Sequence, residues 1–238
     1  MTESAAPADL REKLCLALDV DDLVAANRLA PDHKPWFGVV TIGRELFTAV
    51  GPDAIGTMID QGYKVFVDLK LHDIPNTVER ASKVLGSLGA SYLTMHAHGG
   101  APMLRAGVSG LHEGAASAGL PEPVAVAVTV LTSDADAPEH ILWGRVAAAV
   151  ESGCGGVIVA AADVHEAKQL APRLLAVVPG IRLPSGDPHD QARAATPRDA
   201  FLVGADMLVI GRAVTEAADP PAAAAALHAA IVGGGGGS

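Results

Sequence analysis

The feature that most constrains the fold is a regular alternation of short apolar segments with helix-like segments along a chain of 238 residues. Most of the helix-like segments open at a capping residue or a proline and end at a glycine, as helices commonly do. Near-continuous apolar strands are typical of a parallel sheet that is buried on both faces. We expect strands at 14–20, 38–43, 64–70, 92–98, 124–132, 156–162, 174–182 and 207–213.

Eight strand–helix units in this length predict the α/β class and a single-domain (β/α)₈ TIM barrel. The alternative is a doubly wound open sheet, but the first unit lacks the glycine-rich fingerprint of a dinucleotide site. We expect the barrel to span residues 14–232. A polar segment, 1–13, precedes it, and a Gly/Ser run, 233–238, resembles a flexible linker and is excluded from fold reasoning.

Composition limits the classes of binding partner and the cellular compartment that we expect. The 27 acidic against 17 basic residues give a formal charge of −10, which argues against a nucleic-acid or anionic-membrane surface. No apolar run approaches the roughly 20 residues of a membrane span, and the polar N-terminus is unlike a signal peptide. Two cysteines, Cys15 and Cys154, indicate neither a disulfide framework nor a zinc site, so we expect a reduced cytoplasmic setting.

The strongest local signal is the Asp-x-Lys-x-x-Asp pattern of DLKLHD, at the end of the third expected strand. Side chains two residues apart on a strand share a face, so Asp68 and Lys70 should point together into the mouth of the barrel, where the sites of such barrels lie. Neighbouring carboxylates favour the charged ammonium, which makes Lys70 a fixed cation and proton donor. The alternative is a purely structural ion pair.

A second signal is VIGRAVTEA at the last strand, where Gly211 and Arg212 lead into a helix. Main-chain N–H groups and a forked cation at this point favour a phosphate site, and Arg182 and Gln191 could supply further donors. The alternative is an ordinary turn with a surface arginine. The polar loop 184–196 is the candidate lid.

His96 and His98 form an H-x-H pattern on the fourth expected strand. Such a pair could contribute to a metal site, but no third ligand is evident. We therefore expect a packing or hydrogen-bonding role for His96 and no metal.

The segment VFVDLKLHDIPNTV, residues 65–78, closely resembles the active-site signature of the orotidine 5′-phosphate decarboxylase family. The resemblance continues, in the same order, through LALDVDD, IGRELFTAVGP, VTVLTS, PGIR and VIGRAVT, and covers about residues 14–220. It implies cofactor-free decarboxylation of orotidine 5′-monophosphate to UMP in de novo pyrimidine biosynthesis.

The resemblance also implies roles for individual residues. Lys70 would donate a proton to C6 of the pyrimidine, Asp68 would lie near the substrate carboxylate, and Asp73 would complete the charged array. With Ile74 and Thr77, Asp73 would reach into a partner subunit, which implies a homodimer with shared sites. The implied substrate contacts are Asp19 to the ribose, Thr132 to the pyrimidine, and Arg182, Gln191, Gly211 and Arg212 to the phosphate.

One position departs from the family pattern. A lysine is usual on the second strand, where this chain has Thr41 in VVTIG. Without that cation Asp19 and Asp68 are less compensated, which predicts weakened activity. Two alternatives stay open: a weakened nucleotide-binding barrel or engineered scaffold, and a metal-dependent sugar-phosphate decarboxylase or aldolase of the same superfamily.

Overall fold

The computed structural model describes residues 8–131, 133–134, 138–182 and 195–233. Its eight parallel strands close into one barrel, with each strand paired to the next along the chain and β8 paired to β1. The strands are β1 Leu14–Leu18, β2 Val39–Ile42, β3 Lys64–Leu71, β4 Tyr92–His96, β5 Val124–Val128, β6 Gly156–Ile158, β7 Leu175–Val178 and β8 Met207–Ile210. The predicted (β/α)₈ barrel is confirmed.

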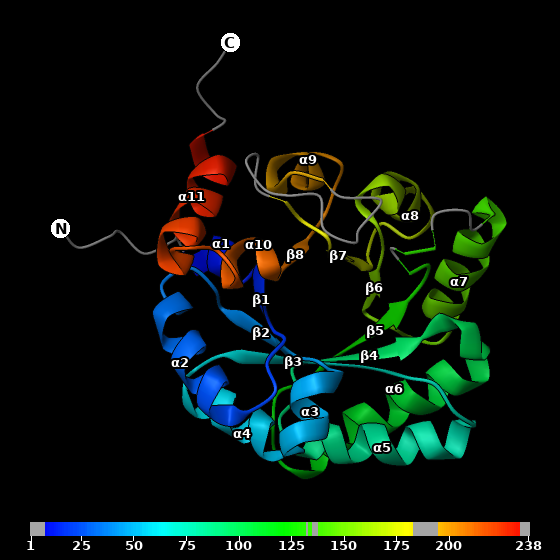
Figure 1. Ribbon diagram of the computed structural model, residues 1–238. Coiled ribbons are helices and arrows are strands. Elements are labelled where there is room, and N and C mark those ends of the chain that lie inside the picture. The colour runs from blue at the N-terminus through cyan, green and yellow to red at the C-terminus, as the bar shows by residue number, and fades with distance from the viewer. Residues whose placement is uncertain (1–7, 132, 135–137, 183–194, 234–238) are drawn as a thin grey trace.

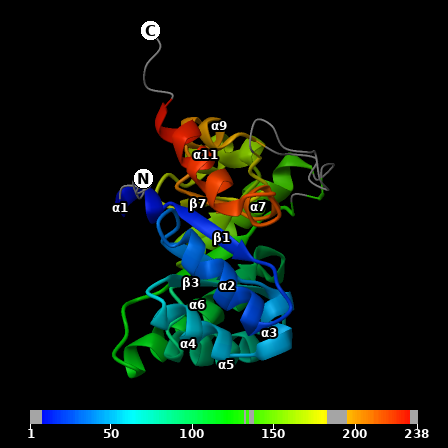
Figure 2. The ribbon, with the colours of Figure 1, turned by 60° about the vertical axis from the view of Figure 1, so that its left-hand side comes forward.

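Helices surround this ring of strands (Figure 1). Figure 2 shows the short helix α1 beside the start of β1. The α-helices are α1 Ala8–Arg11, α2 Leu23–His33, α3 Arg44–Val50, α4 Asp53–Asp60, α5 Pro75–Ser87, α6 Gly100–Ser117, α7 Glu139–Glu151, α8 Val164–Leu170, α9 Pro197–Leu202, α10 Arg212–Thr215 and α11 Pro220–Val232. Two short 3₁₀ segments, Ala97–Gly99 and Ala161–Asp163, follow β4 and β6. None of the helices in the described ranges is both long and apolar enough to cross a bilayer.

Local chemistry explains where several helices begin. Asp22 caps α2 by accepting a hydrogen bond from the Ala25 N–H at 2.7 Å, and Asp219 caps α11 in the same way. Proline at the first helical turn begins α5, α9 and α11, where its missing N–H costs nothing. The capping residues and prolines of the sequence therefore mark true helix starts.

The core has two parts, which follow the two-residue period of the strands. Phe66 belongs to a cluster inside the barrel, with Cys15, Val39, Val126, Val177 and Met207. Val65 and Val67, its neighbours on β3, belong to the larger cluster between the strands and the helices. Residues 65–67 of β3 therefore alternate between the helix-facing side and the barrel interior, and the apolar interior supports the polar layer above it.

Most strands end earlier than the apolar segments suggested. The chain leaves β4 at His96 and turns into a 3₁₀ segment that ends beside Gly100, whose φ of 78° suits glycine. The prediction that His98 shares a strand with His96 is therefore wrong. The residues beyond the strand ends form the loops of the barrel mouth.

Helices α5 and α6 pack closely because glycines let their backbones meet. A Cβ atom added at Gly110 of α6 would overlap the Glu79 carbonyl oxygen of α5, and one added at Gly114 would overlap that of Lys83. Both clashes are with main-chain atoms, which cannot swing aside, so an added methyl group must push the helices apart.

We therefore expect Gly110→Ala to destabilise the protein by about 1–3 kcal/mol through overpacking. The matched control is Gly144→Ala in α7, where an added Cβ meets nothing within 4 Å. That change should stabilise by about 0.5–1 kcal/mol, because alanine favours helix. Urea unfolding of the three proteins measures both effects, and equal stability of the two variants would contradict the packing argument.

Candidate active site

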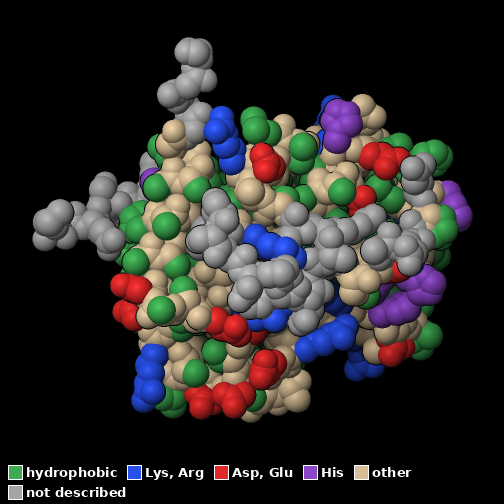
Figure 3. Space-filling model, turned by 45° about the horizontal axis from the view of Figure 1, so that its top comes forward, with side chains coloured by type: hydrophobic (Ala, Val, Ile, Leu, Met, Phe, Trp, Pro, Cys, Tyr) green, Lys and Arg blue, Asp and Glu red, His purple; other side chains and the backbone are tan. Residues whose placement is uncertain are grey.

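The mouth of the barrel gathers polar side chains from neighbouring strands. Asp19 follows β1 by one residue and continues the inward series of Cys15, while Asp68 continues the inward series of Phe66. Thr41 is paired with Phe66 on the adjacent strand and is 4% exposed. Figure 3 shows Lys and Arg side chains near the middle of the face it draws, with acidic side chains beside them.

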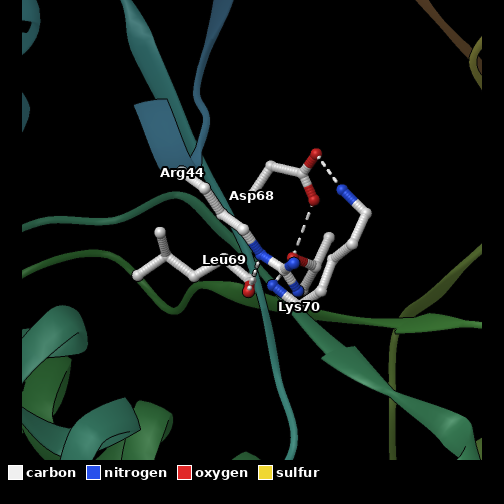
Figure 4. Close-up of polar contacts among 5 residues, drawn as sticks. Arg44, Asp68, Leu69 and Lys70 are labelled. Carbon is white, nitrogen blue, oxygen red and sulfur yellow. Dashed lines mark hydrogen bonds and ion pairs between the residues drawn. The ribbon is translucent and has the colours of Figure 1, made fainter. Parts of the chain in front are cut away.

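Asp68 and Lys70 form the central contact of this site. The Lys70 ammonium lies 2.6 Å from Oδ2 of Asp68, and both side chains are about one quarter exposed, at 28% and 27%. Figure 4 shows the Lys70 side chain curving back so that its ammonium faces this carboxylate. The structure therefore places the two predicted side chains in contact, half-buried at the mouth of the barrel.

The backbone at Lys70 is unusual. Its φ is 52°, and among the residues the structure describes it is the only non-glycine with a positive φ. Such a conformation costs of the order of 1–3 kcal/mol and is commonly found at functional sites. Arg44 of α3 donates from Nε to the Leu69 carbonyl oxygen at 3.2 Å, which helps to fix the strand just before this position (Figure 4).

Thr94 of β4 belongs to the same network, and the sequence analysis missed it. It is fully buried, accepts a hydrogen bond from the Lys70 N–H at 2.8 Å and donates one to Oδ1 of Asp68 at 2.9 Å. The available signal was its position two residues before His96 on the inward face of a neighbouring strand.

Asp19 sits between the ends of two strands. A Cβ atom added at Gly43 would lie 3.2 Å from its Oδ1, and one added at Gly211 would lie 4.0 Å from its Oδ2. Partial burial raises the pKa of Asp19, the Asp68 carboxylate raises it further, and Lys70 and Arg212 oppose the shift. The Asp68 carboxylate therefore disfavours the charge of Asp19, and Thr41 on the adjacent strand carries no charge that could offset it.

The residues after β3 lie on the surface of this chain. Asp73, Ile74 and Thr77 are all exposed, and the Asp73 carboxylate accepts from the Ile74 N–H at 2.6 Å. Within the described part of this chain Asp73 is not paired with Lys70.

The expected phosphate side is partly described. Gly211 directly follows β8 and precedes the four-residue helix α10. Arg212 is partly buried and lies close enough to Asp19 to lower the pKa of that carboxyl group. Arg182 follows β7, and its N–H donates to the Ala195 carbonyl oxygen at 3.0 Å. Thr132, Gln191 and most of the candidate lid lie outside the described residues.

Three histidines line the rim beside Lys70. The ring centroids of His72, His96 and His98 are 5.5–6.4 Å apart. Burial lowers the pKa of His96, and the neighbouring charges of Arg145, His72, His98 and Lys70 lower it further. Among the residues that the structure describes, no three His, Cys, Asp or Glu side chains are grouped so that they could hold a metal ion.

The chain has clear relatives among known proteins. The family model of the orotidine 5′-phosphate decarboxylase / HUMPS family matches residues 12–227. The chain belongs to this family. Among its relatives, the orotidine 5′-phosphate decarboxylase of Moorella thermoacetica is 40% identical over 224 residues and that of Anaeromyxobacter dehalogenans is 42% identical over 220. These alignments cover 88% of this chain and 88% and 93% of the two relatives.

A solved structure of a family member agrees with the fold. The crystal structure of orotidine 5′-phosphate decarboxylase from Lactobacillus acidophilus superposes with a TM-score of 0.78 at 35% sequence identity. The superposition covers 92% of this chain and 98% of that one. The resemblance that rests on residues 65–78 therefore extends to the whole barrel.

The raised pKa of Asp19 predicts how stability depends on pH. The folded protein binds this proton more tightly than the unfolded chain, so the associated stability is present below the ordinary pKa of 3.8 and is lost as the pH rises through the raised value. Asp19→Asn removes the titrating carboxyl group and with it this loss of folding stability. Its melting temperature relative to wild type should therefore increase between about pH 4 and about pH 7.

The effect should be modest, because Asp19 is exposed to solvent by surface area although protein atoms surround its carboxylate. Asp21→Asn, at an exposed position two residues further along, is the matched control and should track wild type at each pH. A constant difference between Asp19→Asn and wild type across this range would contradict the electrostatic account.

Proposed function

We propose that this protein decarboxylates orotidine 5′-monophosphate to UMP, the last step of de novo pyrimidine nucleotide synthesis, without a cofactor. The observation that carries the proposal is the Lys70 ammonium held 2.6 Å from Asp68 at the mouth of a barrel of this family. The curated relatives at 40–42% identity are named as enzymes of this activity.

The proposed chemistry needs one cation and one proton. When the bond from C6 to the carboxylate breaks, CO₂ leaves and its bonding electron pair stays on C6. A fixed ammonium stabilises this charge as it develops, and Lys70 then gives a proton to C6 and recovers one from solvent. Asp68 orients the ammonium and places negative charge near the substrate carboxylate.

The remaining contacts would orient the substrate. We assign Asp19 to the ribose, Thr132 to the pyrimidine, and Arg182, Gln191, Gly211 and Arg212 to the phosphate. Binding energy from a phosphate remote from C6 can be used to orient the ring and to close a loop over it. Arg212 suits this assignment because a guanidinium binds phosphate with two parallel hydrogen bonds.

The proposal includes a homodimer with shared sites. Asp73 and Thr77 are exposed, and Ile74 between them is 65% exposed, so all three side chains are accessible to a second subunit. A partner subunit would cover Ile74 and receive Asp73 beside its own Lys70. The two cysteines are free and buried, in keeping with the cytoplasmic setting that we infer.

The first test is the loss of orotidine 5′-monophosphate absorbance on addition of the purified protein. Lys70→Ala should lower kcat by at least about 10³-fold, because it removes both the charge and the proton donor. The matched control is Lys64→Ala at the opposite end of β3, where an exposed lysine pairs with Glu12 at 3.2 Å. It should keep wild-type turnover, and an active Lys70→Ala protein would refute the mechanism.

Thr41 gives a second test. A lysine at this buried position would place a cation beside the Asp19 and Asp68 carboxylates, where one charge pair is worth about 1–4 kcal/mol. Thr41→Lys should therefore raise kcat/KM by about 10- to 10³-fold. Thr41→Met adds similar length without charge and should not. Unchanged turnover in Thr41→Lys would show that Thr41 does not weaken the enzyme.

A further inference from the structure

The hydrogen-bond network around Lys70 includes Thr94, a residue for which the family resemblance implied no role. Thr94 is fully buried on β4, on the inward face that it shares with Tyr92, whose ring packs against Phe66 inside the barrel. Its single hydroxyl touches both members of the Asp68–Lys70 pair, as acceptor from one main chain and donor to the other side chain.

The register of the sheet explains why a side chain is needed there. Val67 pairs with Leu93 and Leu71 pairs with Met95, so four steps along β3 face two along β4. The extra residues bulge, and Lys70 takes its positive φ within this bulge. The Thr94 hydroxyl accepts the Lys70 N–H within this interruption of the ladder.

The same hydroxyl fixes the carboxylate. Asp68 receives the Thr94 hydroxyl on Oδ1 and the Lys70 ammonium on Oδ2, so each oxygen has its own donor. Rotation of the carboxylate would break one of these two bonds. The uncharged Thr94 hydroxyl therefore fixes the orientation in which the Asp68 carboxylate faces the Lys70 ammonium.

We propose that Thr94 is a positioning residue for the decarboxylation step, and that its hydroxyl holds both the Lys70 main chain and the Asp68 carboxylate in their working geometry. This inference rests on the proposed function. Removing the hydroxyl frees the bulge and the carboxylate together, so the ammonium loses its fixed direction toward C6. Misplacement by about 1 Å can cost about 10²-fold in rate while a remote phosphate still binds.

Three variants separate positioning from folding. Thr94→Val keeps the shape and removes the hydroxyl, Thr94→Ala removes it without filling the space, and Thr94→Ser restores it. The control is Thr129→Val, because Thr129 is another fully buried threonine, just after β5, whose hydroxyl donates to the Ile158 carbonyl oxygen at 2.6 Å. Each protein is measured for kcat, KM, affinity for UMP and melting temperature.

We expect Thr94→Val and Thr94→Ala to lower kcat by about 10²-fold, with KM and UMP affinity within about threefold of wild type. Thr94→Ser should recover kcat to within about fivefold, since it restores both hydrogen bonds. Thr129→Val should keep wild-type kcat even where its melting temperature falls.

Several results would overturn the inference. Wild-type kcat in Thr94→Val or Thr94→Ala would show that the hydroxyl is not needed, and equal losses of kcat and UMP affinity would show a general disruption. Failure of Thr94→Ser to recover activity would exclude the hydroxyl as the cause. If neither hydroxyl-free variant folds while Thr129→Val does, the role is in folding. Absence of turnover in wild type would refute the proposed function, and this role with it.

Discussion

Closure of the eight-stranded parallel sheet is the constraint on which the rest of the structure depends. A closed barrel turns every second side chain of each strand inward, so it needs an apolar filling below and can present polar groups only at the mouth. Phe66 and Asp68, two residues apart on β3, show both layers. The ion pair of Asp68 and Lys70 lies where it does because the apolar layer beneath it excludes water from one side.

Two local energetic costs meet at the site, one electrostatic and one in the backbone. Partial burial raises the pKa of Asp19 and the nearby Asp68 carboxylate raises it further, while Lys70 and Arg212 oppose the shift. The positive φ of Lys70 adds backbone strain at the same place. The free energy of folding of the rest of the barrel must offset both costs. The close packing of α5 on α6 is one contribution to it. Packing elsewhere in the barrel therefore stabilises a site whose charges and backbone are locally unfavourable.

Most of the fold and part of the site could be predicted from sequence. The repeated alternation of apolar and helix-like segments determined the barrel, and the spacing of Asp68 and Lys70 predicted their contact. The exact strand ends were not predicted, since apolar residues such as Ala97 and Ile181 continue past β4 and β7, although Pro179-Gly180 does mark the end of β7. Nor could we predict the slip in register between β3 and β4, which no residue type announces, or the contact of the Thr94 hydroxyl with the Lys70 N–H that accompanies it.

The bridge between Ile181 and Ala195 has a consequence for how this barrel can change. It holds the chain that follows β7 beside the residues just before α9, near the expected phosphate side. A segment whose ends are pinned side by side can be lengthened at little cost in closure entropy. The Ile181–Ala195 bridge therefore fixes where the intervening segment begins and ends, so insertions there need not move β7 or α9, whereas Gln191, which we assign to the phosphate, has to be kept.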